Sequence, residues 1–119
     1  MIKFIEYPRC TTCKKAKQWL KDRGVQFIDI NIVENTPTIE ELKKWIPKSG
    51  QDIKKWFNTS GIKYRELNLK DKLKELSDTE KIKLLASDGM LIKRPILVLD
   101  DTILIGFSKD KWEEKIKNK

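Results

Sequence analysis

The chain has 119 residues, a length that suits one domain with its own hydrophobic core. It contains no histidine, which excludes every catalytic pair and every metal site that needs an imidazole. We expect a cytoplasmic protein, because the start of the chain lacks the pattern of a secretory signal and no apolar run approaches the roughly 20 residues of a membrane span.

The formal net charge is +8, which raises the question of nucleic-acid binding. Most of the basic residues are lysines that alternate with acidic residues, as in 40–44 and 111–115. This mixture is typical of a solvated helix surface, so we expect no direct contact with nucleic acid. An acidic protein partner or an anionic substrate remains compatible with the charge.

The first third of the chain predicts a strand over 2–6, a helix over 12–23 that ends at Gly24, and a second strand over 25–30. A strand, a crossover helix and a second strand form a unit in which the two strands are parallel neighbours.

The two cysteines of the chain, Cys10 and Cys13, lie where the first strand gives way to the helix. A thiol at this place faces unpaired N–H groups and the positive end of the helix dipole, and both favour the reactive thiolate. The second thiol of a Cys-X-X-Cys motif can resolve a mixed disulfide. The pattern therefore indicates thiol–disulfide chemistry, with two inert core cysteines or half of a metal site as the alternative.

The middle of the chain predicts helices. Thr38 with Glu41 and Ser77 with Glu80 form capping-box patterns, which predict one helix to about residue 45, before Pro47, and another to about residue 86. Shorter helical pieces are expected over 53–57, 63–67 and 70–75.

The last third predicts strands over 96–99 and 102–105, joined by a tight turn into an antiparallel hairpin, and then a helix over 109–116. Arg94 and Pro95 directly precede the hairpin. The residues alone favour a trans Arg94–Pro95 bond, whereas the guanidinium of Arg94 suits a thiolate or an oxyanion.

Taken together, these motifs resemble those of the arsenate reductase (ArsC)/Spx family, and within it the chain is most similar to the YusI-type, thiol-reductase-like branch. Segments 7–16, 57–61, 64–67 and 89–96 carry the resemblance. It implies an α/β thioredoxin-like fold, with a mixed four-stranded sheet and flanking helices, as one domain over 1–119 with a helical subdomain inserted at about 37–87. It also implies a cis Pro95 beside the loop of Cys10, and Cys10 as the nucleophile.

Two departures separate the chain from the arsenate reductases that it resembles. Those enzymes hold their oxyanion with further arginines, where this chain has Asn58 and the run 105–107. They also lack a second cysteine at the place of Cys13. The Spx branch, whose regulators bind the RNA polymerase α subunit, carries both the Cys-X-X-Cys motif and an Arg-Pro-Ile motif.

The resulting hypothesis is a thiol–disulfide oxidoreductase without a bound cofactor, in which Cys10 attacks a disulfide and Cys13 resolves the product. Arg94 and Arg9 would stabilise the anionic sulfur. The other proposed substrate-binding residues are Thr11 and Thr12, which would shape or cap the loop, and Pro95, whose backbone would pair with the substrate.

The expected partners are a disulfide substrate and an electron donor, either glutathione or a thioredoxin- or glutaredoxin-like protein. We expect a monomer that does not associate with membranes. Two other functions remain open: an Spx-type redox-sensing regulator that binds the RNA polymerase α subunit, and an arsenate reductase.

Overall fold

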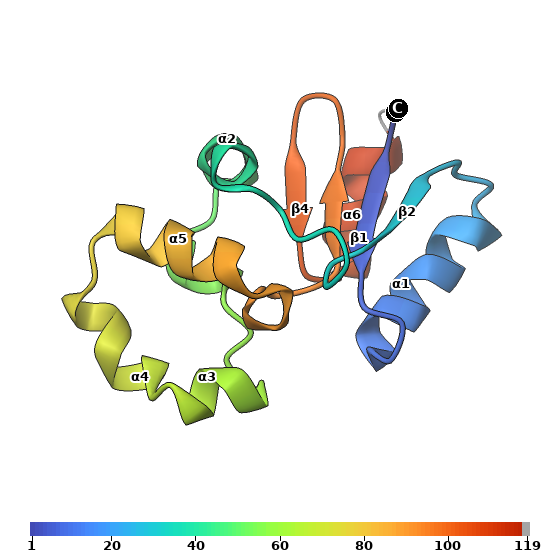
Figure 1. Ribbon diagram of the computed structural model, residues 1–119. Coiled ribbons are helices and arrows are strands. Elements are labelled where there is room, and N and C mark those ends of the chain that lie inside the picture. Colours follow the sequence, from blue (N-terminus) through green and yellow to red (C-terminus); the bar gives the residue numbers. More distant parts are fainter. Residues whose placement is uncertain (118–119) are drawn as a thin grey trace.

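The computed structural model describes residues 1–117 and is built around a four-stranded sheet (Figure 1). The strands are β1 (Lys3–Glu6), β2 (Ile28–Asn31), β3 (Ile96–Val98) and β4 (Ile103–Ile105). Their order across the sheet is β2-β1-β3-β4. Because β1 is parallel to β2 and antiparallel to β3, and β3 is antiparallel to β4, the sheet is mixed, as predicted.

Helices cover both faces of this sheet. The α-helices are α1 (Thr11–Asp22), α2 (Ile39–Ser49), α3 (Ile62–Glu66), α4 (Leu69–Lys72), α5 (Asp78–Ser87) and α6 (Lys109–Lys117). Three short 3-10 segments are η1 (Ile53–Trp56), η2 (Leu73–Glu75) and η3 (Gly89–Leu91). Within residues 1–117, no helix combines the length and the apolar character that a membrane span requires.

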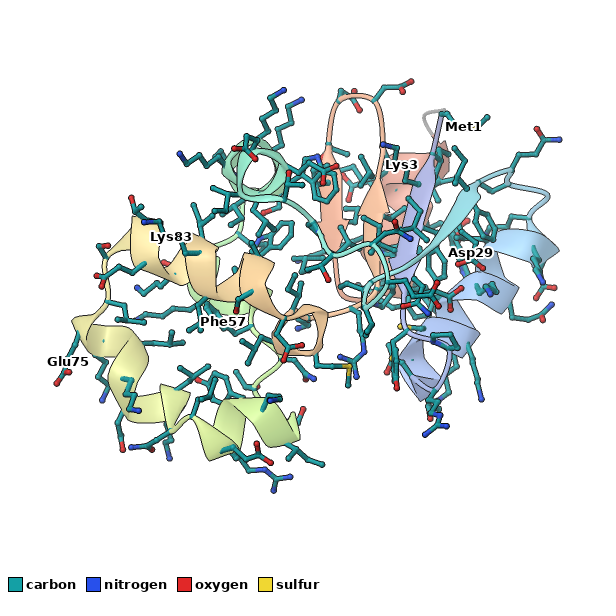
Figure 2. All side chains as sticks on the ribbon, viewed as in Figure 1. Met1, Lys3, Asp29, Phe57, Glu75 and Lys83 are labelled. Atoms are coloured by element: carbon teal, nitrogen blue, oxygen red, sulfur yellow. The ribbon has the colours of Figure 1, made fainter. Side chains whose placement is uncertain are left out.

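Two buried clusters lie on opposite faces of the sheet. One joins Phe4 of β1 to Trp19 of α1 and Trp112 of α6, whose indole rings lie 6.0 Å apart and nearly perpendicular. The other joins Ile5 of β1 and neighbouring strand residues to the helices of residues 39–87. Figure 2 shows Phe57, a member of this second cluster, among those helices under α5.

The helices α2 to α5 all lie between β2 and β3 in the chain and occupy one side of the molecule in Figure 1. Their apolar side chains share one cluster with the sheet. The boundary of a subdomain at about 37–87 therefore stays a prediction. The expected single domain over 1–119 includes residues 118–119, which lie outside the described residues.

The second strand begins later than expected. The sequence predicts a strand over 25–30, but β2 covers Ile28–Asn31. The N–H of Val25 donates to the carbonyl of Leu20 at 3.1 Å, which ties this residue to the end of α1. Pairing with β1 starts only where Ile28 N donates to Ile2 O at 2.8 Å, so the start of β1 sets the start of β2.

The prediction that the helix after Thr38 ends before Pro47 is wrong. The helix α2 continues through Pro47 to Ser49 and ends at Gly50, whose φ of 68° is the left-handed value that glycine adopts without strain. Burial of Ile46 and the hydrogen bond from Ser49 Oγ to Ile46 O, 2.6 Å long, stabilise the last turn. These contacts outweigh the backbone hydrogen bond that a proline cannot make.

The other local predictions are confirmed to within a residue or two. Both capping boxes form: Thr38 Oγ1 accepts from Glu41 N at 3.1 Å, and Ser77 Oγ accepts from Glu80 N at 3.2 Å. The C-terminal hairpin closes with a hydrogen bond of 2.9 Å from Leu99 N to Thr102 O.

A charged cluster connects α1 to the two parallel strands β1 and β2. Lys17 Nζ lies 2.6 Å from Glu6 Oε2 and 2.6 Å from Asp29 Oδ2, and Asp29 is labelled in Figure 2. The side chain of Glu6 is buried, and this burial raises the pKa of its carboxyl group. Lys17 therefore neutralises two carboxylates that would otherwise repel each other beneath α1.

We expect Lys17→Met to destabilise the fold at pH 7, because the buried Glu6 carboxylate then loses its cation. The loss should be only about 1–2 kcal/mol, because the lysine is partly exposed and solvent screens the pair. The deficit should shrink on going from pH 7 to pH 5, since a carboxyl group with a raised pKa binds a proton more readily in the folded state. Chemical denaturation at both pH values measures this effect. The exposed Lys15→Met on the same helix is the control, and an equal loss in both variants would contradict the explanation.

Candidate active site

Cys10 lies in the turn between β1 and α1 and is the N-cap residue of α1. Its Sγ accepts a hydrogen bond from the backbone N–H of Cys13 at 3.3 Å, and its own N–H donates to Tyr7 O at 3.0 Å. The sulfur therefore occupies the place where a serine or threonine oxygen usually caps a helix. Cys10 itself makes the capping contact that we had expected from the hydroxyls of Thr11 and Thr12.

Cys13 sits one turn into α1 and is fully buried, whereas Cys10 is partly exposed. Burial, followed by the hydrogen bond to Cys10, raises the pKa of the Cys13 thiol to about 12. A backbone hydrogen bond from Tyr7 and the charge of Arg94 act in the opposite direction and are weaker. Both thiols are free in this structure.

Arg94 lies on the other side of the site, just before β3, and its bond to Pro95 is cis, as the resemblance implies. Its guanidinium carbon lies 5.2 Å from the centre of the Tyr7 ring. Arg94 Nε and Nη1 are buried and have no hydrogen-bond partner within residues 1–117. Because burying an unpaired cationic donor is costly, these atoms are suited to an anion that enters the site.

Cys10, Thr11, Thr12 and Arg94 line one groove with a volume of about 1020 Å³. The fold thus brings the start of α1 and the segment before β3 to the same groove. The groove continues from this cluster along β4 and between α2 and α6. Its other charged lining residues are Lys48, Lys55, Lys93, Lys111, Lys115 and Glu114.

Three of the proposed site residues do not line this groove: Cys13, which is buried, Arg9 and Pro95. Arg9 is exposed in the turn before Cys10. Pro95 is buried, and its carbonyl accepts a hydrogen bond of 2.8 Å from Gly106 N, so this carbonyl is already used within the hairpin. The expected pairing of a substrate with the Pro95 carbonyl therefore has to compete with an existing bond.

The sequence did not predict a role at the site for Tyr7 or for the lysines of α6. The Tyr7 ring faces Arg94, and its backbone forms a hydrogen bond with the Cys13 thiol. Tyr7 carries a weak signal, because it lies three residues before the first cysteine. Gly106, with a φ of 74°, brings the chain close to Lys93: a Cβ there would lie 2.8 Å from the Cε atom of that lysine. Nothing in the local sequence around Lys111 predicts that it faces the groove.

Within residues 1–117 we find no cluster of three or more cysteine, aspartate or glutamate side chains that could hold a metal ion. The site brings together a partly exposed thiol at a helix N-terminus, a buried second thiol and a guanidinium of which two nitrogens are buried.

Comparison with known proteins gives close relatives over nearly the whole chain. It is 53% identical over 113 residues to the uncharacterized protein YusI of Bacillus subtilis, covering 95% of this chain and 96% of YusI. It is 32% identical to the regulatory protein MgsR of the same organism, covering 99% and 92% of the two chains.

Solved structures also resemble the protein over nearly its whole length. An ArsC family related protein from Bacteroides fragilis superposes with a TM-score of 0.93 at 47% identity, covering 95% of each chain. An arsenate reductase from Vibrio cholerae gives 0.81 at 25% identity, covering 98% of this chain and 95% of the other. These neighbours establish the thioredoxin-like α/β fold. The ArsC family model matches residues 5–115, and the chain therefore belongs to the ArsC family.

Proposed function

We propose that this protein is a thiol–disulfide oxidoreductase with Cys10 as the nucleophile and Cys13 as the resolving thiol. The observation that carries the proposal is the pairing of the two thiols at the start of α1. One sulfur is partly exposed, receives a backbone hydrogen bond and lines a groove, and the other is buried directly behind it. A nucleophile needs access to its substrate, whereas a resolving thiol needs access only to the first sulfur.

The reaction begins when the thiolate of Cys10 attacks one sulfur of the substrate disulfide. The substrate S–S bond breaks, a mixed disulfide with Cys10 forms, and the released sulfur takes a proton from solvent. Cys13 then attacks the Cys10 sulfur and gives its proton, through solvent, to the departing substrate sulfur. The bond between Cys10 and the substrate breaks, the Cys10–Cys13 bond forms, and the second substrate thiol leaves. Two electrons have then passed to the substrate, and the protein holds a Cys10–Cys13 disulfide.

Glutathione, or a small thioredoxin- or glutaredoxin-like protein, is the proposed donor that reduces the Cys10–Cys13 disulfide again. Arg94 is proposed to stabilise the anionic sulfur during the exchange, because two of its donors are buried without a partner beside the groove. The backbone N–H of Cys13 supplies a second donor to the same sulfur. Arg9, which is exposed outside the groove, is no longer proposed for this role.

A redox-sensing regulator is the second candidate, and the 32% identity to MgsR over nearly the whole chain favours it. A regulator of the kind found in the Spx branch would bind the RNA polymerase α subunit in a manner that depends on the Cys10–Cys13 disulfide. It would turn over disulfides negligibly, so catalytic turnover separates the two candidates.

Arsenate reduction is less well supported by the residues of the groove. Asn58 and residues 105–107, where the resemblance implies oxyanion-binding arginines, line the groove without an arginine. Each charge-assisted hydrogen bond contributes roughly 1.5–3 kcal/mol, so the absence of two such ligands weakens binding of a tetrahedral oxyanion.

The first experiment measures NADPH-coupled turnover of hydroxyethyl disulfide with glutathione and glutathione reductase, and of arsenate in a parallel assay that also contains glutaredoxin. Above the rate of the same assay without the protein, we expect turnover of the disulfide by the wild type and none by Cys10→Ser, because the serine hydroxyl is a far weaker nucleophile. Cys13→Ser, mixed with the disulfide in the absence of glutathione, should retain attack and accumulate a mixed disulfide, which mass spectrometry detects. Disulfide turnover by Cys10→Ser at the wild-type rate would refute the proposed mechanism.

The second prediction concerns the two thiols of the reduced protein. With a pKa of about 12, only about 10⁻⁴ of Cys13 is thiolate at pH 8. We expect iodoacetamide at pH 8 to modify Cys10 and to reach Cys13 only after unfolding in guanidinium chloride. Peptide mapping by mass spectrometry locates the adducts, and equal labelling of both cysteines in the folded protein would contradict the assigned roles.

The third prediction concerns Arg94. We expect Arg94→Met to lower kcat/KM for the disulfide by about ten- to a hundredfold, which corresponds to the loss of one charge-assisted hydrogen bond. Arg94→Lys should restore part of the loss, because it retains the charge. Arg65→Met, at an exposed arginine of α3, is the matched control, and circular dichroism verifies that each variant is folded. Unchanged kinetics in Arg94→Met would remove Arg94 from the mechanism.

A further inference from the structure

The groove that contains Cys10 follows the edge of β4 rather than one face of the sheet. Every residue from 102 to 108 lines it. Side chains of a strand alternate between its two faces. Ile103 belongs to the cluster on the side of α2, and Leu104 belongs to the cluster on the side of α1 and α6. A groove that touches both residues must therefore run beside the strand.

The strand β4 presents a backbone edge to this groove. It is the outermost strand of the sheet, and within residues 1–117 its one strand partner is β3. The hydrogen bonds from Gly106 N to Pro95 O and from Leu99 N to Thr102 O show which residues face β3. Since backbone groups alternate along an antiparallel strand, those of Ile103 and Ile105 are directed to the outer side.

The groove has a strong excess of positive charge. Among the described residues of its lining, one is a carboxylate, Glu114, and six have cationic side chains, namely Lys48, Lys55, Lys93, Arg94, Lys111 and Lys115. Lys111 and Lys115 are one helical turn apart and share a face of α6. The hydrogen bond of 3.1 Å from Trp112 Nε1 to Gly106 O holds that helix against the end of β4.

We propose that this groove binds an acidic, extended peptide segment of the substrate protein, which adds as a further strand to the edge of β4 and carries its half-cystine to Cys10. Main-chain pairing with an exposed strand edge supplies affinity without a particular sequence, and the lysines supply a preference for acidic side chains. The inference rests on the proposed function, because the disulfide exchange at Cys10 is that of the oxidoreductase.

The size and lining of the groove favour a peptide over other anions. Its volume of about 1020 Å³ is at the upper limit of small-molecule pockets, so a small disulfide would fill a minor part of it. Single-stranded nucleic acids bind through exposed aromatic rings on which bases stack. Phe107 and Trp112 are the aromatic residues of the lining, and Trp112 is only 1% exposed.

The test measures binding without chemistry, using the full chain with Cys10→Ser and Cys13→Ser. The probes are a fluorescent nine-residue peptide rich in glutamate, with serine in place of its half-cystine, and a twin with glutamine at each glutamate. We expect the acidic peptide to bind at least about tenfold more tightly, with the difference lost in 0.5 M NaCl. Equal affinity for both peptides, or tighter binding of a single-stranded oligonucleotide, would overturn the proposal.

Charge reversal locates the site. Lys111→Glu with Lys115→Glu should weaken binding of the acidic peptide by about tenfold or more. The matched control, Lys70→Glu with Lys74→Glu, changes the net charge equally at exposed positions outside the groove and should have a smaller effect. Equal losses in the two double variants would indicate nonspecific attraction and refute the site.

Backbone NMR tests the strand addition directly. We expect the acidic peptide to shift the amide signals of Ile103 and Ile105 and to protect them from hydrogen exchange. Shifts confined to the lysine-bearing helix α6, with β4 unaffected, would refute pairing with the strand edge.

Turnover separates this proposal from the proposed function. With intact cysteines, Lys111→Glu with Lys115→Glu should lower kcat/KM for an acidic peptide disulfide more than kcat/KM for the glutamine twin of that disulfide. An equal loss with both substrates would overturn the peptide site. Absence of all turnover in the wild type, together with selective binding of the acidic peptide, would refute the oxidoreductase while leaving the binding surface in place.

Discussion

The packing of α1 against the sheet is the constraint on which the site depends. Cys13, Ala16, Trp19 and Leu20 occupy one face of this helix and are all buried, in a cluster with Phe4 of β1. This face fixes the rotation of the helix about its axis. One turn earlier, the same geometry leaves Cys10 at the open end with its sulfur on the Cys13 N–H. A single helix therefore makes one thiol accessible and hides the other.

The opposite wall of the site comes from the far end of the chain and depends on a second set of contacts. The hairpin of β3 and β4 places Arg94 beside Tyr7, since β3 pairs with β1 and Tyr7 directly follows β1. Trp112 of α6 then contacts Trp19 of α1 and donates to Gly106 O. The two walls are consequently connected through the core, and a change in the packing of Trp112 would alter both.

The sequence predicts the parts of this structure that depend on local pattern. Several features depend on a few neighbouring residues, and the sequence predicts them: the capping boxes at Thr38 and Ser77, the hairpin, and the position of Cys10 at a helix start. The sequence does not predict that α2 continues through Pro47, because this depends on the burial of Ile46 and on the hydrogen bond from Ser49 Oγ. The cis state of Pro95 was implied only by the family resemblance, and the contact of Arg94 with Tyr7 is known only from the fold.

The basic groove illustrates why function was harder to predict than fold. The sequence of 111–115 is typical of a solvated helix with mixed charge. In the structure, however, Lys111, Glu114 and Lys115 of this segment line the groove, together with lysines from three other segments. The excess charge arises only when the fold assembles lysines that are far apart in the chain. The composition gives the net charge, but the positions of the charged side chains on the surface depend on the fold.

Among the described residues that line the groove, Arg94 is the one arginine, and this bears on what the site stabilises. A tetrahedral oxyanion spreads charge over several oxygens and needs donors from several directions. A thiolate concentrates one charge on one atom, for which a guanidinium and the Cys13 N–H provide donors from two sides. Two buried nitrogens of Arg94 have no partner within residues 1–117, and a single anionic sulfur would satisfy them at less cost than leaving them unpaired. On this argument, the residues of the groove fit exchange between sulfur atoms better than transfer of electrons to an oxyanion.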